Sequence, residues 1–146
     1  MFKLQMTKSE WENYIYKKLN IQSGHYKPLT FDQNYKEVIN ELLSFVSKFR
    51  YYNFIHGDLR LNSILYDNEK HNFTLVNFSK SKFKLTQLTN DEYYFDFISL
   101  YFDICKFNNK ELTNYLQKEI IKYIPYSEIY TLHQISNGLS DIIDLY

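Results

Sequence analysis

Apolar positions recur at helical spacing in the first third of the chain and predict two helices. The first of the two helices is expected over about 8–19, where Thr7 and Glu10 have the spacing of a capping box. The residues of 20–29 include glycine and proline, so this stretch is expected to be a loop. The stronger helix is predicted over about 32–50, because apolar residues fall there at i, i+4, i+7, i+8 and i+11: Val38, Leu42, Phe45, Val46 and Phe49.

Two short β-prone runs follow the long helix. They cover 64–66 and 73–76, and the polar residues 67–72 between them are typical of a turn. The pattern therefore predicts a β-hairpin. The stretch 79–88 after it is polar and has no period, so we expect it to lie at the surface.

Helical spacing returns in the last third of the chain. A buried helix is expected over about 91–106 behind a capping box, Thr89-Asn-Asp-Glu92, and another helix should end before Pro125. A last helical stretch is predicted from Ser127 onward. We find no repeat and no linker, so the fold class is expected to be mainly α with a small β-hairpin (α+β), in a single domain over 1–146.

Composition narrows the classes of partner. The 146 residues carry 17 Lys+Arg and 17 Asp+Glu, so the chain has no basic field to attract nucleic acid or anionic lipid. A single cysteine, Cys105, fits a reducing compartment. Neither a signal-peptide core nor a membrane span is apparent. We expect an intracellular, cytoplasmic protein that binds neither membrane nor nucleic acid.

The link between the long helix and the hairpin carries the candidate chemistry. It reads His56-Gly-Asp-Leu59, and the second β-run ends in Val76-Asn-Phe-Ser79. A loop with His and Asp that leads into a hairpin resembles the catalytic loop of protein-kinase-like enzymes, H-x-D-L-x-x-x-N, and the second motif stands where that family has D-F-G. The glycine variant looks most like compact atypical kinases and aminoglycoside-type phosphotransferases.

The resemblance implies a role for each residue of the loop. Asp58 matches the aspartate that orients the acceptor hydroxyl and takes its proton, and His56 the histidine that packs beneath the loop. Arg60 stands at the position of the loop lysine and is expected to contact a phosphate. Asp96 matches the aspartate that braces the catalytic loop from the following helix, and Phe2-Lys-Leu-Gln-Met6 stands where the hinge strand would be.

The chain departs from the family at its metal ligands and upstream of the long helix. Ser63 replaces the loop asparagine and Asn77 replaces the D-F-G aspartate, whereas Mg²⁺ prefers charged oxygens. With three glycines in the whole chain there is no glycine-rich loop, and no strand lysine can be placed. The resemblance is thus to a kinase-like C-lobe lacking the N-terminal lobe. The alternative is that both residues have a structural role alone: Asp58 accepts N–H bonds of the loop, and Asn77 forms a turn at the end of a strand.

Three functions remain open. In the first, the chain is a degenerate kinase-like module, without a cofactor, that binds a protein partner or itself over the hinge and hairpin surface. In the second, it is a phosphotransferase that uses ATP and Mg²⁺, with Asp58 as base and Arg60, Ser63 and Asn77 holding the ligand, completed by a partner chain. In the third, it is an unrelated helical domain. The other histidines lack metal-ligand spacing, so no metal site is expected: His25, His71 and His133.

Overall fold

The computed structural model describes residues 5–125 and 127–128. The helices are α1 (Lys8–Lys18), α2 (Tyr35–Ser47), α3 (Asn90–Cys105) and α4 (Lys110–Ile120). The strands are β1 (Lys27–Pro28), β2 (Phe54–Ile55), β3 (Ile64–Asp67), β4 (Asn72–Leu75) and β5 (Lys82–Phe83). Short 3₁₀ helices cover η2 (Lys48–Tyr52), η3 (Leu61–Ser63) and η4 (Phe78–Lys80). The described part is mixed α+β and mainly helical, which confirms the predicted fold class.

The predicted hairpin is present, and two further strands accompany it. β3 and β4 pair antiparallel with Ile64 opposite Leu75, and β1 pairs with the free edge of β3. β2 and β5 form a separate two-stranded sheet. The expectations of a plain loop at 20–29 and a plain surface segment at 79–88 were therefore incomplete. Strands of two residues are too short to produce a period, and they exist because a partner strand supplies their hydrogen bonds.

The helix ends are set mostly by the predicted capping residues. Thr7 and Thr89 both form complete capping boxes, with Glu10 and Glu92 respectively. The helix predicted over 32–50 begins later than expected: α2 starts at Tyr35, after Asn34, whose side chain makes no capping hydrogen bond. The predicted end of this helix, 48–50, continues as the 3₁₀ helix η2. The expected hinge strand 2–6 and the last helical stretch from Ser127 fall largely outside the described residues.

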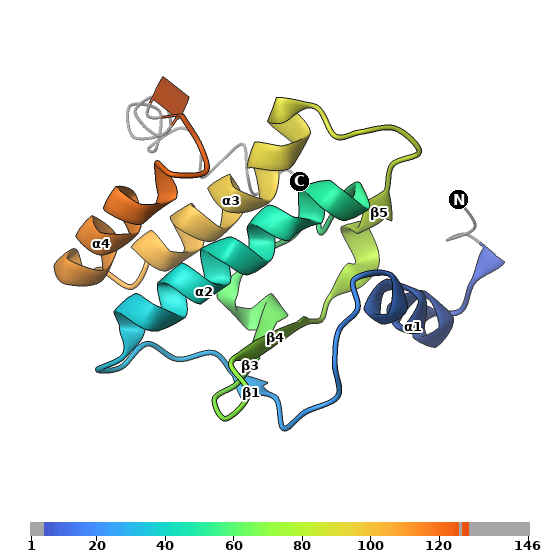
Figure 1. Ribbon diagram of the computed structural model, residues 1–146, viewed down its shortest axis with the longest axis horizontal. Coiled ribbons are helices and arrows are strands. Elements are labelled where there is room, and N and C mark those ends of the chain that lie inside the picture. The colour runs from blue at the N-terminus through green and yellow to red at the C-terminus, as the bar shows by residue number, and fades with distance from the viewer. Residues whose placement is uncertain (1–4, 126, 129–146) are drawn as a thin grey trace.

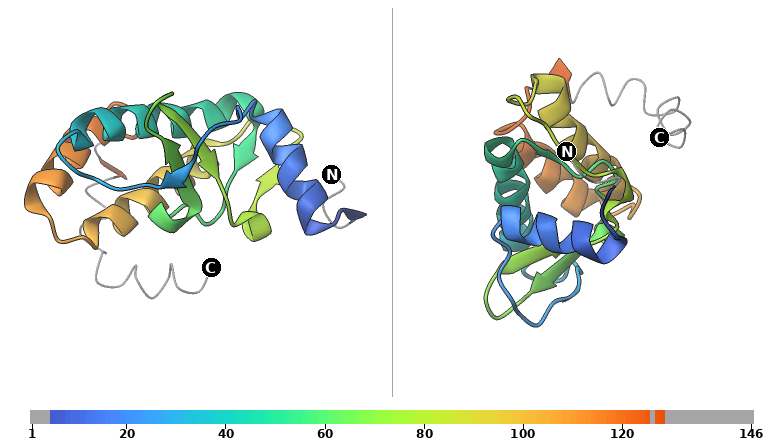
Figure 2. Two further views of the ribbon diagram at one scale, coloured as in Figure 1. Left: turned by 90° about the horizontal axis from the view of Figure 1, so that it is seen from below. Right: turned by 90° about the vertical axis from the view of Figure 1, so that its right-hand side faces the viewer.

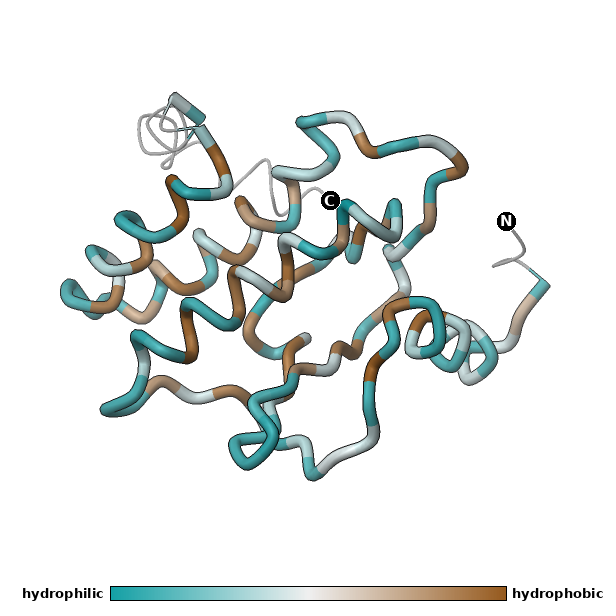
Figure 3. The backbone as a smooth tube through the Cα atoms, viewed as in Figure 1, coloured by the Kyte–Doolittle hydropathy of each residue, from teal (hydrophilic) through white to brown (hydrophobic). Residues whose placement is uncertain are grey.

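The core lies between the helices and the strands. α2, α3 and α4 lie side by side, the hairpin and β1 project from one side of them, and α1 lies at the end away from α4 (Figures 1 and 2). Brown positions alternate with teal ones along α2 in Figure 3. Phe45 of the predicted stripe is half-buried, and the other members are buried: Val38, Leu42, Val46 and Phe49. β2 and β5 pair beside this core. Phe54 of β2 and Phe97 of α3 are completely buried in it. None of the described helices combines the length and apolarity that a membrane span requires.

Candidate functional site

The His56-Gly57-Asp58 segment is tied to α3 by one buried carboxylate. The backbone N–H of His56 donates to Asp96 Oδ2 (2.8 Å) and that of Gly57 to Asp96 Oδ1 (3.1 Å). Asp96 is 2% exposed. This burial raises the pKa of Asp96 to about 6, while the two N–H donors act in the opposite direction. The structure thus brings Asp96 to the loop, with both of its oxygens in use there.

A second aspartate of α3 holds the other end of the loop. The N–H of Leu61 donates to Asp103 Oδ2 (2.8 Å). Asp103 lies seven residues after Asp96, which places the two side chains on the same face of the helix. Sequence reasoning missed Asp103, although this seven-residue spacing was the available signal.

His56 is buried, and its hydrogen bonds define its tautomer. Its Nε2 lies 2.8 Å from the carbonyl oxygen of Val76, which only accepts, so Nε2 carries the proton. Its Nδ1 then accepts the backbone N–H of Asp58 (3.1 Å). Burial lowers the pKa of His56, against smaller opposite effects of the Val76 carbonyl and Asp58. A neutral imidazole with both nitrogens engaged positions the backbone of Asp58 and joins the loop to the end of β4.

The tight turn at Gly57 packs against the segment after the hairpin. Gly57 has φ +89°, and a Cβ there would meet the backbone carbonyl of Lys80. The hydroxyl of the buried Ser81 donates to the carbonyl oxygen of His56 (2.6 Å). Only glycine fits this position, both for its backbone angle and for its space.

The carboxylate of Asp58 lies at the surface of the loop beside a guanidinium. Arg60 Nε is 3.0 Å from Asp58 Oδ1, and their side chains are 37% and 32% exposed. A pair this exposed adds little to stability. It does leave one carboxylate and one cation within reach of a molecule that approaches the loop.

The two residues predicted to replace metal ligands, Ser63 and Asn77, differ in exposure. Ser63 is completely buried, and its hydroxyl donates to the carbonyl oxygen of Asp58 (3.0 Å). Asn77 is exposed and left-handed, with φ 63° and ψ 59°, and its Nδ2 lies 3.5 Å from the carbonyl oxygen of Asn62. The structure gathers Asp58, Ser63 and Asn77 around one loop. That these side chains hold a nucleotide or phosphate stays a prediction.

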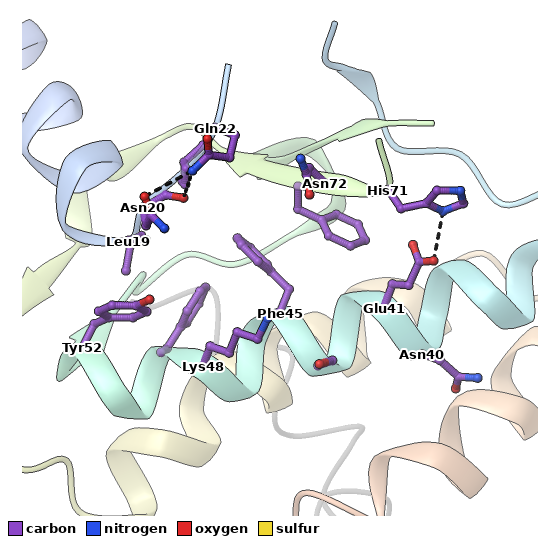
Figure 4. A pocket seen from close by; sticks show the side chains of 14 residues that line it. Leu19, Asn20, Gln22, Asn40, Glu41, Phe45, Lys48, Tyr52, His71 and Asn72 are labelled. Carbon is purple, nitrogen blue, oxygen red and sulfur yellow. Dashed lines mark hydrogen bonds and ion pairs between the residues drawn. The ribbon is translucent and has the colours of Figure 1, made fainter. Parts of the chain in front are cut away.

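In the described part of the chain, one cavity borders the loop at Gly57 and another borders it at Leu61, Asn62 and Asp103. The cavity at Gly57 has a volume of about 380 Å³, with Phe95 and Ile55 in its lining and Lys80, Lys82, Asp91 and Glu92 as its charged members. A larger one, of about 500 Å³, lies between the end of α1, α2 and the hairpin (Figure 4). Phe45 points into it, Phe73 is part of its lining, and none of residues 56–63 lines it.

No protein-family model matches the chain, and no curated protein matches it.

Proposed function

We propose that this chain is a kinase-like C-lobe whose phosphoryl-transfer site is degenerate, and that it acts by binding another protein. The observation that carries the proposal is the pair of N–H bonds from His56 and Gly57 to the buried Asp96. The resemblance assigned this bracing role to Asp96 from sequence position alone. The hairpin that follows directly on the loop supports the same assignment and argues against an unrelated helical domain.

The chemistry of the loop favours loss of catalysis. Asn77 presents a neutral amide where the family has a carboxylate, and Ser63 is directed into the loop. Mg²⁺ is usually held by one or two carboxylates together with substrate phosphates. Replacing the carboxylate with an amide removes the attraction between a negative charge and the metal ion. At contact distance near a protein surface, such an attraction is on the order of several kcal/mol.

Exposed apolar side chains support binding to a protein. The apolar residues of the hairpin are turned into the core, since Tyr66, Phe73 and Leu75 are all buried. In the described part of the chain, Tyr51 and Leu85 are instead 83% and 89% exposed. Their segments adjoin, because the N–H of Lys84 donates to the carbonyl oxygen of Asn53 (2.8 Å). We expect a partner, or a second copy, to cover this surface.

Dye binding and sedimentation test this surface. We expect the purified chain to bind a hydrophobic dye or to self-associate as its concentration rises, because water is excluded from Tyr51 and Leu85 in either case. The double variant Tyr51→Ser, Leu85→Ser should lose this behaviour. Ile121→Ser, at an exposed apolar position at the end of α4, is the matched control and should retain it. A stable monomer that binds no dye would count against the proposal.

Asp58 and Arg60 favour a second candidate, a phosphotransferase completed by a partner chain. The carboxylate of Asp58 is accessible, and an accessible carboxylate is what a general base toward an acceptor hydroxyl requires. The candidate differs from the first in requiring metal-dependent nucleotide binding that responds to Asp58→Ala or Asn77→Ala.

A further inference from the structure

A histidine and two glutamates converge at the outer edge of the hairpin, away from the His56 loop. Glu37 and Glu41 lie four residues apart on α2 and so share one face of the helix. His71 comes from the turn between β3 and β4. One side-chain ligand atom from each of the three lies within 4.8 Å of the others. The structure thus brings His71 to two glutamates that lie 34 and 30 positions before it in the sequence.

The distances fit a small ion. His71 Nδ1 is 3.0 Å from Glu41 Oε1 and 3.9 Å from Glu37 Oε1. Ligands at a bond length of about 2.0–2.1 Å around a tetrahedral Zn²⁺ stand about 3.4 Å apart. The two observed distances lie on either side of that spacing, and the oxygens of Glu37 and Glu41 lie within 4.8 Å of each other. Rotations of the exposed Glu37 and His71 side chains would bring the three atoms to it.

A buried tyrosine orients the central carboxylate. Tyr66 is 8% exposed and packs on Phe73, and its hydroxyl donates to Glu41 Oε2 (2.8 Å). The same hydroxyl oxygen lies 2.9 Å from His71 Nδ1. Glu41 therefore turns Oε1 toward the imidazole, as the dashed line in Figure 4 shows. Metal-bound carboxylates are commonly fixed by such an outer hydrogen bond.

The charges of the two carboxylates favour binding of a cation at the cluster. Two carboxylates lie beside one imidazole, so the negative charge of the cluster attracts a cation toward its centre. The ion pairs of Glu37 and Glu41 in the described part of the chain are with His71 alone, without a lysine or arginine.

We propose that Glu37, Glu41 and His71 bind a divalent transition-metal ion, Zn²⁺, in place of the proton on His71 Nδ1. One imidazole nitrogen with two carboxylates is a donor set that zinc accepts, whereas Mg²⁺ and Ca²⁺ prefer oxygen alone. Glu41 and His71 also line the larger cavity, so a fourth ligand, water or a donor group of a molecule held there, would approach from that side. The site is independent of the kinase-like loop.

Competition with a chromophoric zinc chelator tests the site on the full chain after metal is stripped. We expect the wild type to bind one Zn²⁺ more tightly than His71→Ala or Glu37→Gln does, by about tenfold or more for each ligand lost. His25→Ala and Glu69→Gln are matched controls and should bind as the wild type does, because His25 and Glu69 are exposed and lie outside the cluster.

The melting temperature distinguishes loss of zinc binding from loss of folding. Zn²⁺ should raise the melting temperature of the wild type and not that of the two variants, since binding to the folded state stabilises it. Glu37 is 60% exposed, so Glu37→Gln is expected to fold even if His71→Ala does not. Equal zinc affinity in Glu37→Gln and the wild type would overturn the proposal. So would absence of binding to the wild type, which would leave the cluster as a hydrogen-bonded ion pair only.

Discussion

Replacing Asp96 with alanine is expected to lower the free energy of unfolding by about 4 kcal/mol. The change leaves the N–H groups of His56 and Gly57 buried without an acceptor, and each such group costs about 1–3 kcal/mol. Removing a buried charge offsets only part of this loss. Urea unfolding, followed by circular dichroism at a pH well above 6, measures the difference while Asp96 is ionised.

Two further variants make the result specific to these hydrogen bonds. Asp96→Asn keeps one acceptor oxygen and is expected to lose about half as much. Asp91→Ala, on the same helix but exposed, should change stability by less than about 0.5 kcal/mol. If Asp96→Ala proves no more harmful than Asp91→Ala, the loop does not depend on its hydrogen bonds to Asp96.

The variant Gly57→Ala is expected to be destabilised by about 3 kcal/mol or more. A side chain at φ +89° is strained by about 1–2 kcal/mol, and forcing a methyl group into a packed site adds about 1–3 kcal/mol. The obstruction is the backbone carbonyl of Lys80, which cannot rotate away as a side chain would. Chemical denaturation of the variant and the wild type measures the loss.

The variant Asn53→Ala distinguishes the backbone strain at a positive φ from the steric crowding that Gly57→Ala would also cause. Asn53 also has a positive φ, 54°, at the end of η2, so its replacement should cost only the conformational term of about 1 kcal/mol. Equal losses at the two positions would mean that contact with Lys80 contributes nothing.

The elements that the sequence predicted are those with a local cause. The capping boxes of α1 and α3 need only residues three apart, and the stripe of α2 needs only helical periodicity. The hairpin likewise follows from two β-prone runs around a polar turn. Such signals are complete within a few neighbouring residues.

What the sequence did not predict depends on distant partners. β5 exists because β2 pairs with it, across 27 residues from Ile55 to Lys82. Asp103 is explained only by the N–H of Leu61, 42 residues away. Single histidines show no metal spacing in sequence, and His71 acquires carboxylate neighbours only when the hairpin packs on α2. The spacing of Asp96 and Asp103 places them on one helix face, but periodicity does not identify the distant group that each side chain contacts.

The central claim, a kinase-like lobe without phosphoryl-transfer chemistry, is tested most directly by a thermal-shift titration. The wild type is mixed with ATP or ADP, each with and without Mg²⁺ or Mn²⁺, alongside Asp58→Ala, Asn77→Ala and, as a neighbouring control, Asn62→Ala. A ligand at about 100 times its dissociation constant stabilises the folded state by about 2.7 kcal/mol, which is readily measured. We predict no metal-dependent shift with either nucleotide. A metal-dependent rise that Asp58→Ala or Asn77→Ala removes, and Asn62→Ala does not, would contradict the account and establish nucleotide binding at the loop.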